Sequence, residues 1–302
     1  MTRFIAEIGS NHNGERARCL ELVDAAAAAG CSAVKLQVFH VDDLFAAEAL
    51  ARHPHLAARR AWELPLDFLP ALRARCDARG IGLGATPFGL WAVEALMDHV
   101  GFFKVASYEL LWHELIDACA ASGKPLILST GMATLDEVAA AVQAARAGGA
   151  EPRLLHCVSG YPTPPAQCNL AAIATLRAHF GVPVGWSDHT GSEQVVRRAV
   201  RRWGASDVEL HIDLDGAGNE AGEHNWAPAR LHALIGSVAA ADRGRAAGEE
   251  EDGSPGATNA ATLDGDGVKR PMPVELADIP WRADPEDGLR PLRALRGELV
   301  EA

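Results

Sequence analysis

Two histidines stand near the ends of two short apolar runs, where side chains can do chemistry. The runs are Val184-Gly-Trp-Ser-Asp-His-Thr-Gly191 and Val208-Glu-Leu-His-Ile-Asp213. Residues 192–203 between them have a helical pattern, so the stretch predicts a βαβ unit. Because reactive groups in parallel α/β proteins lie where strands end, we expect His189 and His211 to meet at one mouth. Two imidazoles there can hold a divalent metal ion. The alternative is an ordinary structural histidine at each strand end.

Polar side chains mark most of the other predicted strand ends. They are Glu7, Lys35, Thr86, Lys104, Ser107, Glu109, Ser129, Tyr161 and Ser187. A lone ammonium group is costly to bury in a barrel interior, so two lysines inside strands are informative. They predict a site for a phosphate or carboxylate, completed by the serine hydroxyls.

Two alternatives stay open for these side chains. Each lysine could instead pair with a structural carboxylate such as Glu7 or Glu109, and either glutamate could orient an acceptor hydroxyl or move a proton. Tyr161 could hydrogen-bond a substrate or brace its own turn. His156 and Cys157 lie in an apolar strand, and we interpret both as core residues.

Eight strand patterns, each followed by a helical pattern, position these residues. The first six strands are predicted over residues 4–9, 32–38, 81–86, 102–107, 125–129 and 153–158. The first helix, from about Glu15 to Ala29, ends at Gly30, a typical C-terminal cap. This count predicts a TIM barrel, (β/α)8, over residues 1–247. The long connection 42–63 is expected to form a lid or pocket wall.

The composition changes after the barrel. Residues 248–267 are rich in Gly, Asp, Glu, Ala and Thr and predict a flexible linker. Residues 268–302 are too few for a second core, and we expect this tail to pack on the barrel if it is ordered.

Composition and charge narrow the classes of partner. The chain has 302 residues and a formal net charge of -12, which argues against nucleic acid or an anionic membrane as its partner. Its six cysteines are scattered, as in a reduced cytosolic protein. The sequence shows no signal peptide and no apolar run near the roughly 20 residues that span a bilayer. A cytoplasmic location is therefore expected.

Seven motifs occur in an order that resembles the sialic acid synthase family, the phosphoenolpyruvate-dependent N-acetylneuraminate, legionaminate and pseudaminate synthases. They are Ala6-Glu-Ile-Gly-Ser-Asn-His-Asn-Gly14, Val34-Lys-Leu-Gln37, Ala85-Thr-Pro-Phe88, Lys104-Val-Ala-Ser107, Leu126-Ile-Leu-Ser-Thr-Gly-Met132, Leu155-His-Cys-Val-Ser-Gly-Tyr-Pro-Thr-Pro164 and Trp186-Ser-Asp-His-Thr190. The similarity runs from about residue 4 to residue 240.

The resemblance implies a metal-dependent TIM barrel that condenses phosphoenolpyruvate with an aldose to a 2-keto-3-deoxy sugar acid and phosphate. Manganese is the expected metal, with magnesium and cobalt as alternatives, and His189 and His211 are its implied ligands. The acceptor would lie near Glu7, Glu109 and Tyr161. The residues implied to line the phosphoenolpyruvate site are Lys35, Thr86, Lys104, Ser107, Ser129, Ser159 and Ser187.

The sequence departs from the family on the acceptor side. Members carry a C-terminal antifreeze-like domain that reaches over the partner barrel in a dimer, whereas here only the linker and short tail follow the barrel. A homodimer is still an expectation. Glu223 stands where an acceptor-binding aspartate is expected, and Leu210 replaces a basic neighbour of His211. The expected acceptor is an N-acyl-hexosamine such as N-acetylmannosamine or a relative, with a sugar phosphate as an alternative.

Two other functions remain open from the sequence. One is a barrel aldolase in which Lys35 or Lys104 forms a Schiff base with its substrate. The other is a barrel without catalysis that binds a sugar or a partner protein.

Overall fold

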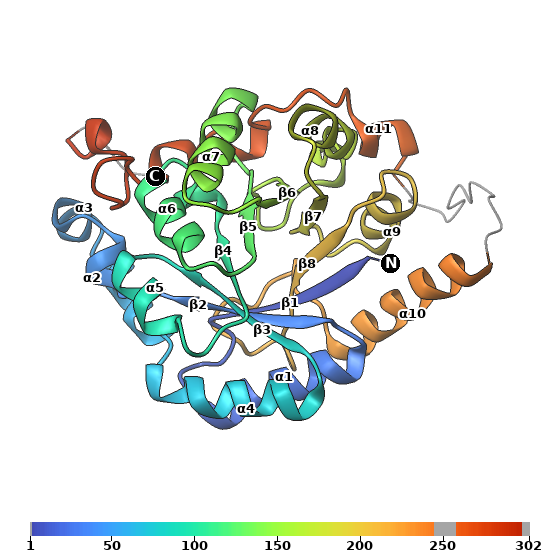
Figure 1. The fold of residues 1–302 in the computed structure, drawn as a ribbon, viewed down its shortest axis with the longest axis horizontal. Coiled ribbons are helices and arrows are strands. Elements are labelled where there is room, and N and C mark those ends of the chain that lie inside the picture. The colour runs from blue at the N-terminus through green and yellow to red at the C-terminus, as the bar shows by residue number, and fades with distance from the viewer. Residues whose placement is uncertain (1, 245–257, 298–302) are drawn as a thin grey trace.

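Eight parallel strands close into a barrel, in agreement with the predicted (β/α)8 fold. The computed structural model describes residues 2–244 and 258–297. The strands are hydrogen-bonded in chain order, from β1 to β8, and β1 closes the barrel on β8. Figure 1 shows them at the centre of the molecule with helices around them. Their bounds are β1 Arg3–Gly9, β2 Ala33–Val38, β3 Gly82–Pro87, β4 Phe102–Val105, β5 Leu126–Ser129, β6 Arg153–Cys157, β7 Val184–Asp188 and β8 Asp207–His211.

A helix follows each strand and covers the barrel from outside. The sequence explains where two of these helices end or begin. Gly30 ends α1 with a φ of 96°, a left-handed conformation that glycine adopts without strain. Thr134 and Glu137 form a capping box at the start of α7. The outer helices are α1 Arg16–Ala29, α4 Leu69–Arg79, α5 Leu90–Leu96, α6 His113–Ala121, α7 Leu135–Ala147, α8 Ala172–Phe180, α9 Glu193–Arg201 and α10 Pro228–Gly244.

The barrel interior has an apolar layer beneath a polar one. The apolar layer is a cluster of Ile5, Ala33, Ile127 and Leu155, against which Phe102 packs. Gly84 makes room for it, since a Cβ there would lie 2.1 Å from a ring carbon of Phe102. Further along the strands the inward side chains become polar and charged. The side chains that can do chemistry on a substrate are therefore expected at the carboxyl ends of the strands.

Two strands end earlier than the sequence predicted. β4 ends at Val105 because Ser107–Glu109 form a 3-10 turn. β8 ends at His211, and only Ile212 continues as an isolated bridge to Trp226. Both differences move polar residues from a strand into the loop that follows it.

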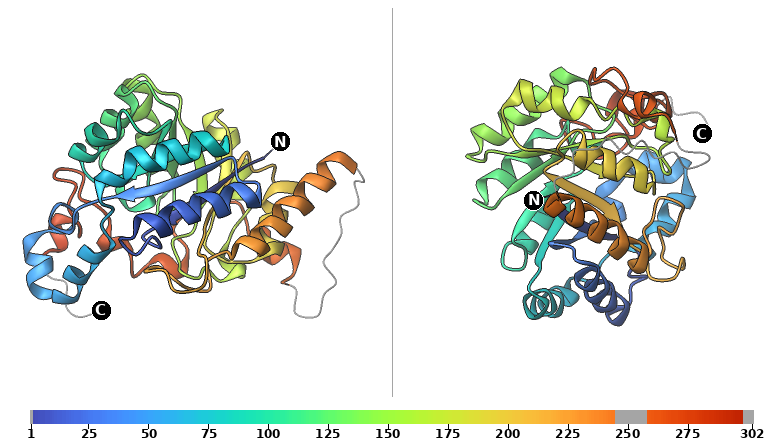
Figure 2. Two further views of the ribbon diagram at one scale, coloured as in Figure 1. Left: turned by 90° about the horizontal axis from the view of Figure 1, so that it is seen from below. Right: turned by 90° about the vertical axis from the view of Figure 1, so that its right-hand side faces the viewer.

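The long connection after β2 and the tail meet over the carboxyl ends of the strands. The connection contains α2 (Val41–Leu44), α3 (Ala47–Arg52) and a 3-10 helix over Pro54–Trp62. Phe45 forms a parallel bridge with Arg290 of the tail. The left view of Figure 2 shows the light-blue connection and the red tail together at one end of the barrel.

The tail packs on the barrel, and part of the expected linker does so too. Residues 258–267, predicted to be flexible, include α11 (Ala260–Asp264), whose Leu263 is buried. The Asn169 side chain bonds the backbone of Gly267 and Val268, and Asp264 pairs with Arg198. The linker prediction is therefore wrong for this part, because one leucine and a few polar anchors suffice to dock it. Residues 248–257 lie outside the described residues.

Two further expectations concern cysteines and membranes. The six cysteines are buried and unpaired in the described part of the chain. Among the residues that the structure describes, no helix has both the length and the apolar character to cross a bilayer.

Glu275 anchors the tail to the strand ends. Its buried carboxylate accepts backbone N–H groups from Met132 at 2.7 Å, Ser159 at 2.7 Å and Met272 at 2.8 Å. The first two belong to the loops after β5 and β6, so one tail carboxylate fixes two loops at the barrel mouth.

We predict that Glu275→Gln lowers the free energy of unfolding by about 1.5–3 kcal/mol, the typical contribution of hydrogen bonds to a charged group. The glutamine side chain lacks the negative charge of the carboxylate and has one acceptor oxygen in place of two for the three backbone N–H groups. Urea unfolding measures the change. Glu286→Gln in the same tail, which removes an exposed pair with Arg293, should cost less than about 1 kcal/mol. Equal effects of the two substitutions would contradict the anchoring role.

Candidate active site

A cavity of about 530 Å³ opens at the carboxyl ends of the strands. This volume is in the usual range for small-molecule sites. We call the part formed by the barrel the inner chamber; it is lined by Glu7, Lys35, Thr86, Lys104, Ser107, Cys157, His189, Glu209 and His211. We call the part formed by the long connection and the tail the outer chamber; it is lined by Leu44, Phe45, His53, His55, Leu56, Arg59, Trp62, Asp278, Trp281 and Arg290.

Both predicted lysines lie in the inner chamber, and both have carboxylate partners. Lys35 forms an ion pair with Glu7 and donates a hydrogen bond to the Thr86 hydroxyl at 2.8 Å. Lys104 pairs with Glu209 at 2.5 Å. The structural pairing considered for Lys35 and Glu7 is therefore present. It does not remove the lysines from the site, because both still line the cavity.

The Lys104–Glu209 pair keeps a positive charge inside the barrel. Burial by itself would lower the pKa of Lys104, but the adjacent Glu209 carboxylate outweighs burial and raises it. The ammonium group is therefore charged, which suits anion binding and disfavours an amine nucleophile.

Serine hydroxyls and a glycine form a small cradle in the loops after β4, β5 and β6. The Gly131 N–H donates to the Ser107 hydroxyl at 3.0 Å. A Cβ on Gly131 would lie 2.2 Å from the Ser159 hydroxyl and 2.8 Å from that of Ser107, so only glycine fits. Ser129 is buried nearby in sequence, and its hydroxyl has no partner among the described residues. Ser187 donates to Glu209 at 3.2 Å.

The structure brings the two predicted imidazoles together. The rings of His189 and His211 have centroids 5.5 Å apart. His189 Nδ1 lies 3.0 Å from the Val158 carbonyl, and the tautomer that donates there leaves Nε2 free as a ligand. Burial lowers the pKa of His211 well below its ordinary value, so this imidazole is neutral, as metal binding requires. His211 Nδ1 is buried without a partner among the described residues. These features fit a divalent metal ion.

Other rings surround this pair. The Tyr161 ring lies against that of His189, with centroids 4.2 Å apart and the ring planes tilted by 34°. The ring of His224, a residue not predicted from the sequence, has its centroid 5.1 Å from that of the His211 ring. Cys157 was interpreted as core; it is buried but lines the cavity, with Sγ 3.8 Å from His189 Nδ1. His156, by contrast, is in the core and bonds the Cys168 carbonyl at 2.9 Å. In the described part of the chain, no group of three or more His, Cys, Asp or Glu is arranged to hold a metal.

Glu109 is held by an arginine of the tail. It is buried and bound by Arg290 of the tail, whose Nε donates to its Oε1 at 2.8 Å. Arg290 in turn lines the outer chamber and lies over the rings of Phe88 and Tyr108. The negative charge of Glu109 fixes the guanidinium of Arg290, while its Oε2 has no partner among the described residues. A role for Glu109 in moving a proton stays a prediction.

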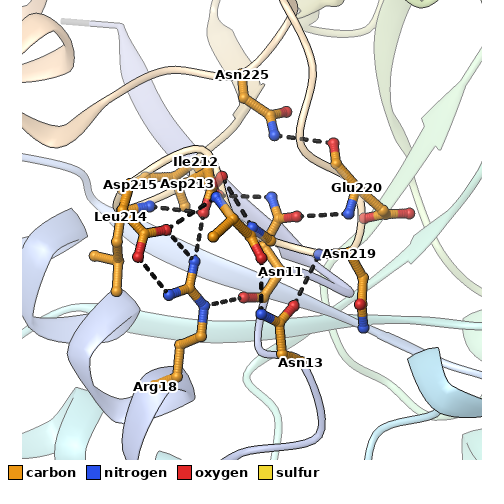
Figure 3. Close-up of polar contacts among 12 residues, drawn as sticks. Asn11, Asn13, Arg18, Ile212, Asp213, Leu214, Asp215, Asn219, Glu220 and Asn225 are labelled. Atoms are coloured by element: carbon orange, nitrogen blue, oxygen red, sulfur yellow. Dashed lines mark hydrogen bonds and ion pairs between the residues drawn. The ribbon is translucent and has the colours of Figure 1, made fainter.

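Glu220, and not Glu223, reaches the cavity from the loop after β8. Figure 3 shows how this loop is tied to the loop after β1. Asn11 accepts the Glu220 N–H at 2.8 Å, Asn13 accepts the Asn219 N–H at 2.8 Å, and Arg18 pairs with Asp213 at 2.7 Å. These contacts set the loop so that Glu220 lines the cavity while Glu223 is exposed. Glu223 therefore does not line this cavity, and a role for it in binding the acceptor stays a prediction.

Glu209 is the main residue that sequence reasoning missed. It sits two residues before His211 on β8, so both side chains point into the barrel. The period of two along a strand could have found it. Arg59, Asp278 and Arg290 carried no such signal, because they reach the cavity only through the fold of the connection and the tail.

The sequence of the chain is similar to those of known proteins. Residues 22–250 match the NeuB family. An uncharacterized protein of Methanocaldococcus jannaschii is 38% identical over 71% of this chain and 63% of its own length. The N,N'-diacetyllegionaminic acid synthase of Campylobacter jejuni is 33% identical over 71% of this chain and 68% of its own.

The solved structures include a similar barrel. The N-acetylneuraminic acid synthetase of Leptospira borgpetersenii, in complex with citrate, has a TM-score of 0.75 and 30% identity over 83% of this chain and 87% of its own. The chain spans 60–63% of the length of the first two curated relatives it matches. The match to most of the barrel and the shared fold establish that the chain belongs to the NeuB family.

Proposed function

We propose that the protein condenses phosphoenolpyruvate with an aldose to give a 2-keto-3-deoxy sugar acid of the nonulosonate type and phosphate. The expected acceptor is an N-acyl-hexosamine such as N-acetylmannosamine or a relative. One observation carries the proposal: two charged lysines and two adjacent imidazoles line the same chamber. The printed names of relatives, which include legionaminic and pseudaminic acid synthases, support it.

Lys35 and Lys104 would hold the anionic groups of phosphoenolpyruvate. Two ammonium groups stabilise a phosphate and a carboxylate better than hydroxyls alone. The Ser107, Gly131 and Ser159 cradle offers the donors and the space for phosphate oxygens. Their partners Glu7 and Glu209 keep the chamber from carrying uncompensated charge before the substrate binds.

Glu7 is the best placed carboxyl group to move a proton. It pairs with Lys35 and is opposite His211 in the β1–β8 register. Burial raises its pKa against the lowering effect of Lys35. A raised pKa suits a carboxyl group that must both accept and give up a proton.

His189 and His211 would hold a divalent metal ion, with manganese expected and magnesium or cobalt as alternatives. When bound, such an ion polarises the acceptor carbonyl as a Lewis acid, so that carbon three of phosphoenolpyruvate can attack it. The hydrogen bond of His189 to Val158 fixes the ring for this purpose. The homodimer and the cytoplasmic location stay predictions.

The two other functions are less well supported by the geometry. A Schiff-base aldolase needs a lysine that loses its proton readily, whereas Glu209 raises the pKa of Lys104 against the effect of burial. A barrel that only binds would not need two ion pairs and two imidazoles gathered in one chamber.

Phosphate release tests the proposal directly. We expect phosphate from phosphoenolpyruvate only when manganese and a suitable aldose are both present, in a panel of hexosamines and their 6-phosphates. Borohydride with a keto acid should trap no adduct. A trapped lysine adduct without phosphate release would establish the aldolase instead.

His189→Ala and His211→Ala are predicted to abolish turnover and to lose the bound metal, because each removes one imidazole ligand. Metal content by mass spectrometry after gel filtration measures the second effect without turnover. His232→Ala changes an exposed histidine on α10 and should leave both unchanged. A His189→Ala protein that releases phosphate at the normal rate in metal-depleted buffer would refute the role.

Lys104→Met is predicted to raise KM for phosphoenolpyruvate by roughly 10- to 100-fold, since a charged hydrogen bond contributes about 1.5–3 kcal/mol. The single variant also leaves Glu209 buried without its partner, at a cost of about 3–5 kcal/mol in stability. The double variant Lys104→Met/Glu209→Gln removes that charge. If the double variant is stable and keeps the wild-type KM, Lys104 does not bind the substrate.

A further inference from the structure

The outer chamber contains two arginines that leave donors for a ligand. Arg59, on the 3-10 helix Pro54–Trp62, lines the chamber and is half-buried. Its guanidinium lies over the rings of Phe45 and Trp62, at 5.7 and 5.3 Å from their centroids. Within residues 2–244 and 258–297 it forms no hydrogen bond or ion pair. A guanidinium held by two rings and lacking a carboxylate is available to an anion.

Arg290 reaches the same chamber from the tail. Its Nε and Nη2 are bound to Glu109, and its Cζ lies 4.3 Å from the centroid of the Tyr108 ring. Nη1 has no partner in the described part of the chain. The pKa of Arg59 is lowered, first by burial and then by the nearby charge of Arg290. Two guanidinium groups thus face one space from two different segments.

Glu109 is bound to Arg290, whereas no carboxylate among the described residues is bound to Arg59. Asp278 and Glu220 also line the cavity. Burial raises the pKa of both, that of Glu220 to about 7. Glu220 already accepts the Ser10 N–H at 2.8 Å. In a chain with a net charge of -12, a guanidinium that lines a cavity without a bound carboxylate, as that of Arg59 does, indicates a function in binding anions.

We propose that Arg59 and Arg290 bind a phosphate or carboxylate group on the acceptor, at the end of the molecule farthest from the reacting aldehyde. The proposal rests on the proposed function, which places the aldehyde beside His189 and His211. The outer chamber lies at the other end of the same cavity, where carbon six of a hexose would extend. The Phe45 and Trp62 rings would pack against the sugar while the guanidiniums bind its charged substituent.

Binding without turnover tests the proposal. Titration calorimetry at saturating phosphoenolpyruvate, which fills the inner lysine site, would compare a 2-acetamido-hexitol with its 6-phosphate and with the corresponding C6 carboxylate. Hexitols lack the aldehyde and cannot react. One of the two anions should bind at least about 10-fold tighter than the neutral hexitol, and the stronger one identifies the charged group. Equal binding of all three would overturn the proposal.

Arg59→Gln should remove that preference and leave binding of the neutral hexitol unchanged. Arg60→Gln is the matched control, because its neighbouring guanidinium is exposed and pairs with Asp42. An Arg59→Gln protein that keeps the full preference would contradict the role of Arg59. Arg290 is not the primary variant, since its loss also leaves Glu109 buried without a partner.

Turnover separates this proposal from the proposed function. If phosphate is released equally with neutral and anionic aldoses, and Arg59→Gln has no effect, the condensation stands and the anion site is refuted. If no aldose supports phosphate release but the 6-phosphate hexitol still binds through Arg59, the anion site stands and the condensation is refuted.

Discussion

The paired burial of lysine and glutamate inside the barrel is the constraint on which the site depends. An isolated ammonium or carboxylate would be very costly in this interior, and a pair is tolerated only with good geometry and further hydrogen bonds. Lys35 with Glu7 and Lys104 with Glu209 meet that condition, and Thr86 and Ser187 add hydrogen bonds. Below these pairs lies the apolar layer, and the ion pairs of Asp207 with Arg3 and Arg153 lie at the opposite, amino ends of the strands.

The segments beyond the strands complete this arrangement. Glu275 of the tail accepts backbone N–H groups from the loops after β5 and β6. Arg290, also in the tail, is bound to Glu109 and lines the outer chamber. The long connection supplies Arg59 and most of the aromatic wall. The barrel therefore carries the phosphoenolpyruvate and metal functions that we propose, and the connection and tail shape the place of the acceptor. This division suits a fold in which loops vary while the strands keep their chemistry.

Residue period and strand order were enough to predict the barrel and much of the inner chamber. Lys35, Lys104, His189 and His211 each end or interrupt an apolar run, and a parallel barrel must bring such positions together. The outer chamber could not be predicted in this way. Its arginines depend on how the connection and tail dock.

The conformation of the loop after β8 could not be predicted either, because it depends on contacts between residues far apart in the sequence. Glu220, which the sequence did not predict, reaches the cavity through contacts of Asn11, Asn13 and Arg18 with the loop after β8. These contacts join residues some 200 positions apart, such as Asn11 and Glu220 with a separation of 209. Docking of residues 258–267 likewise follows from a single buried leucine and Asp264. Composition alone does not reveal such contacts.

Relaxation of the phosphorus nucleus of phosphoenolpyruvate by protein-bound manganese tests the central claim most directly, because it requires the metal and the substrate phosphate to share one chamber. The account predicts strong enhancement of the ³¹P relaxation rate in the wild-type protein and its loss in His189→Ala. Manganese and phosphoenolpyruvate that both bind without any enhancement would contradict the account.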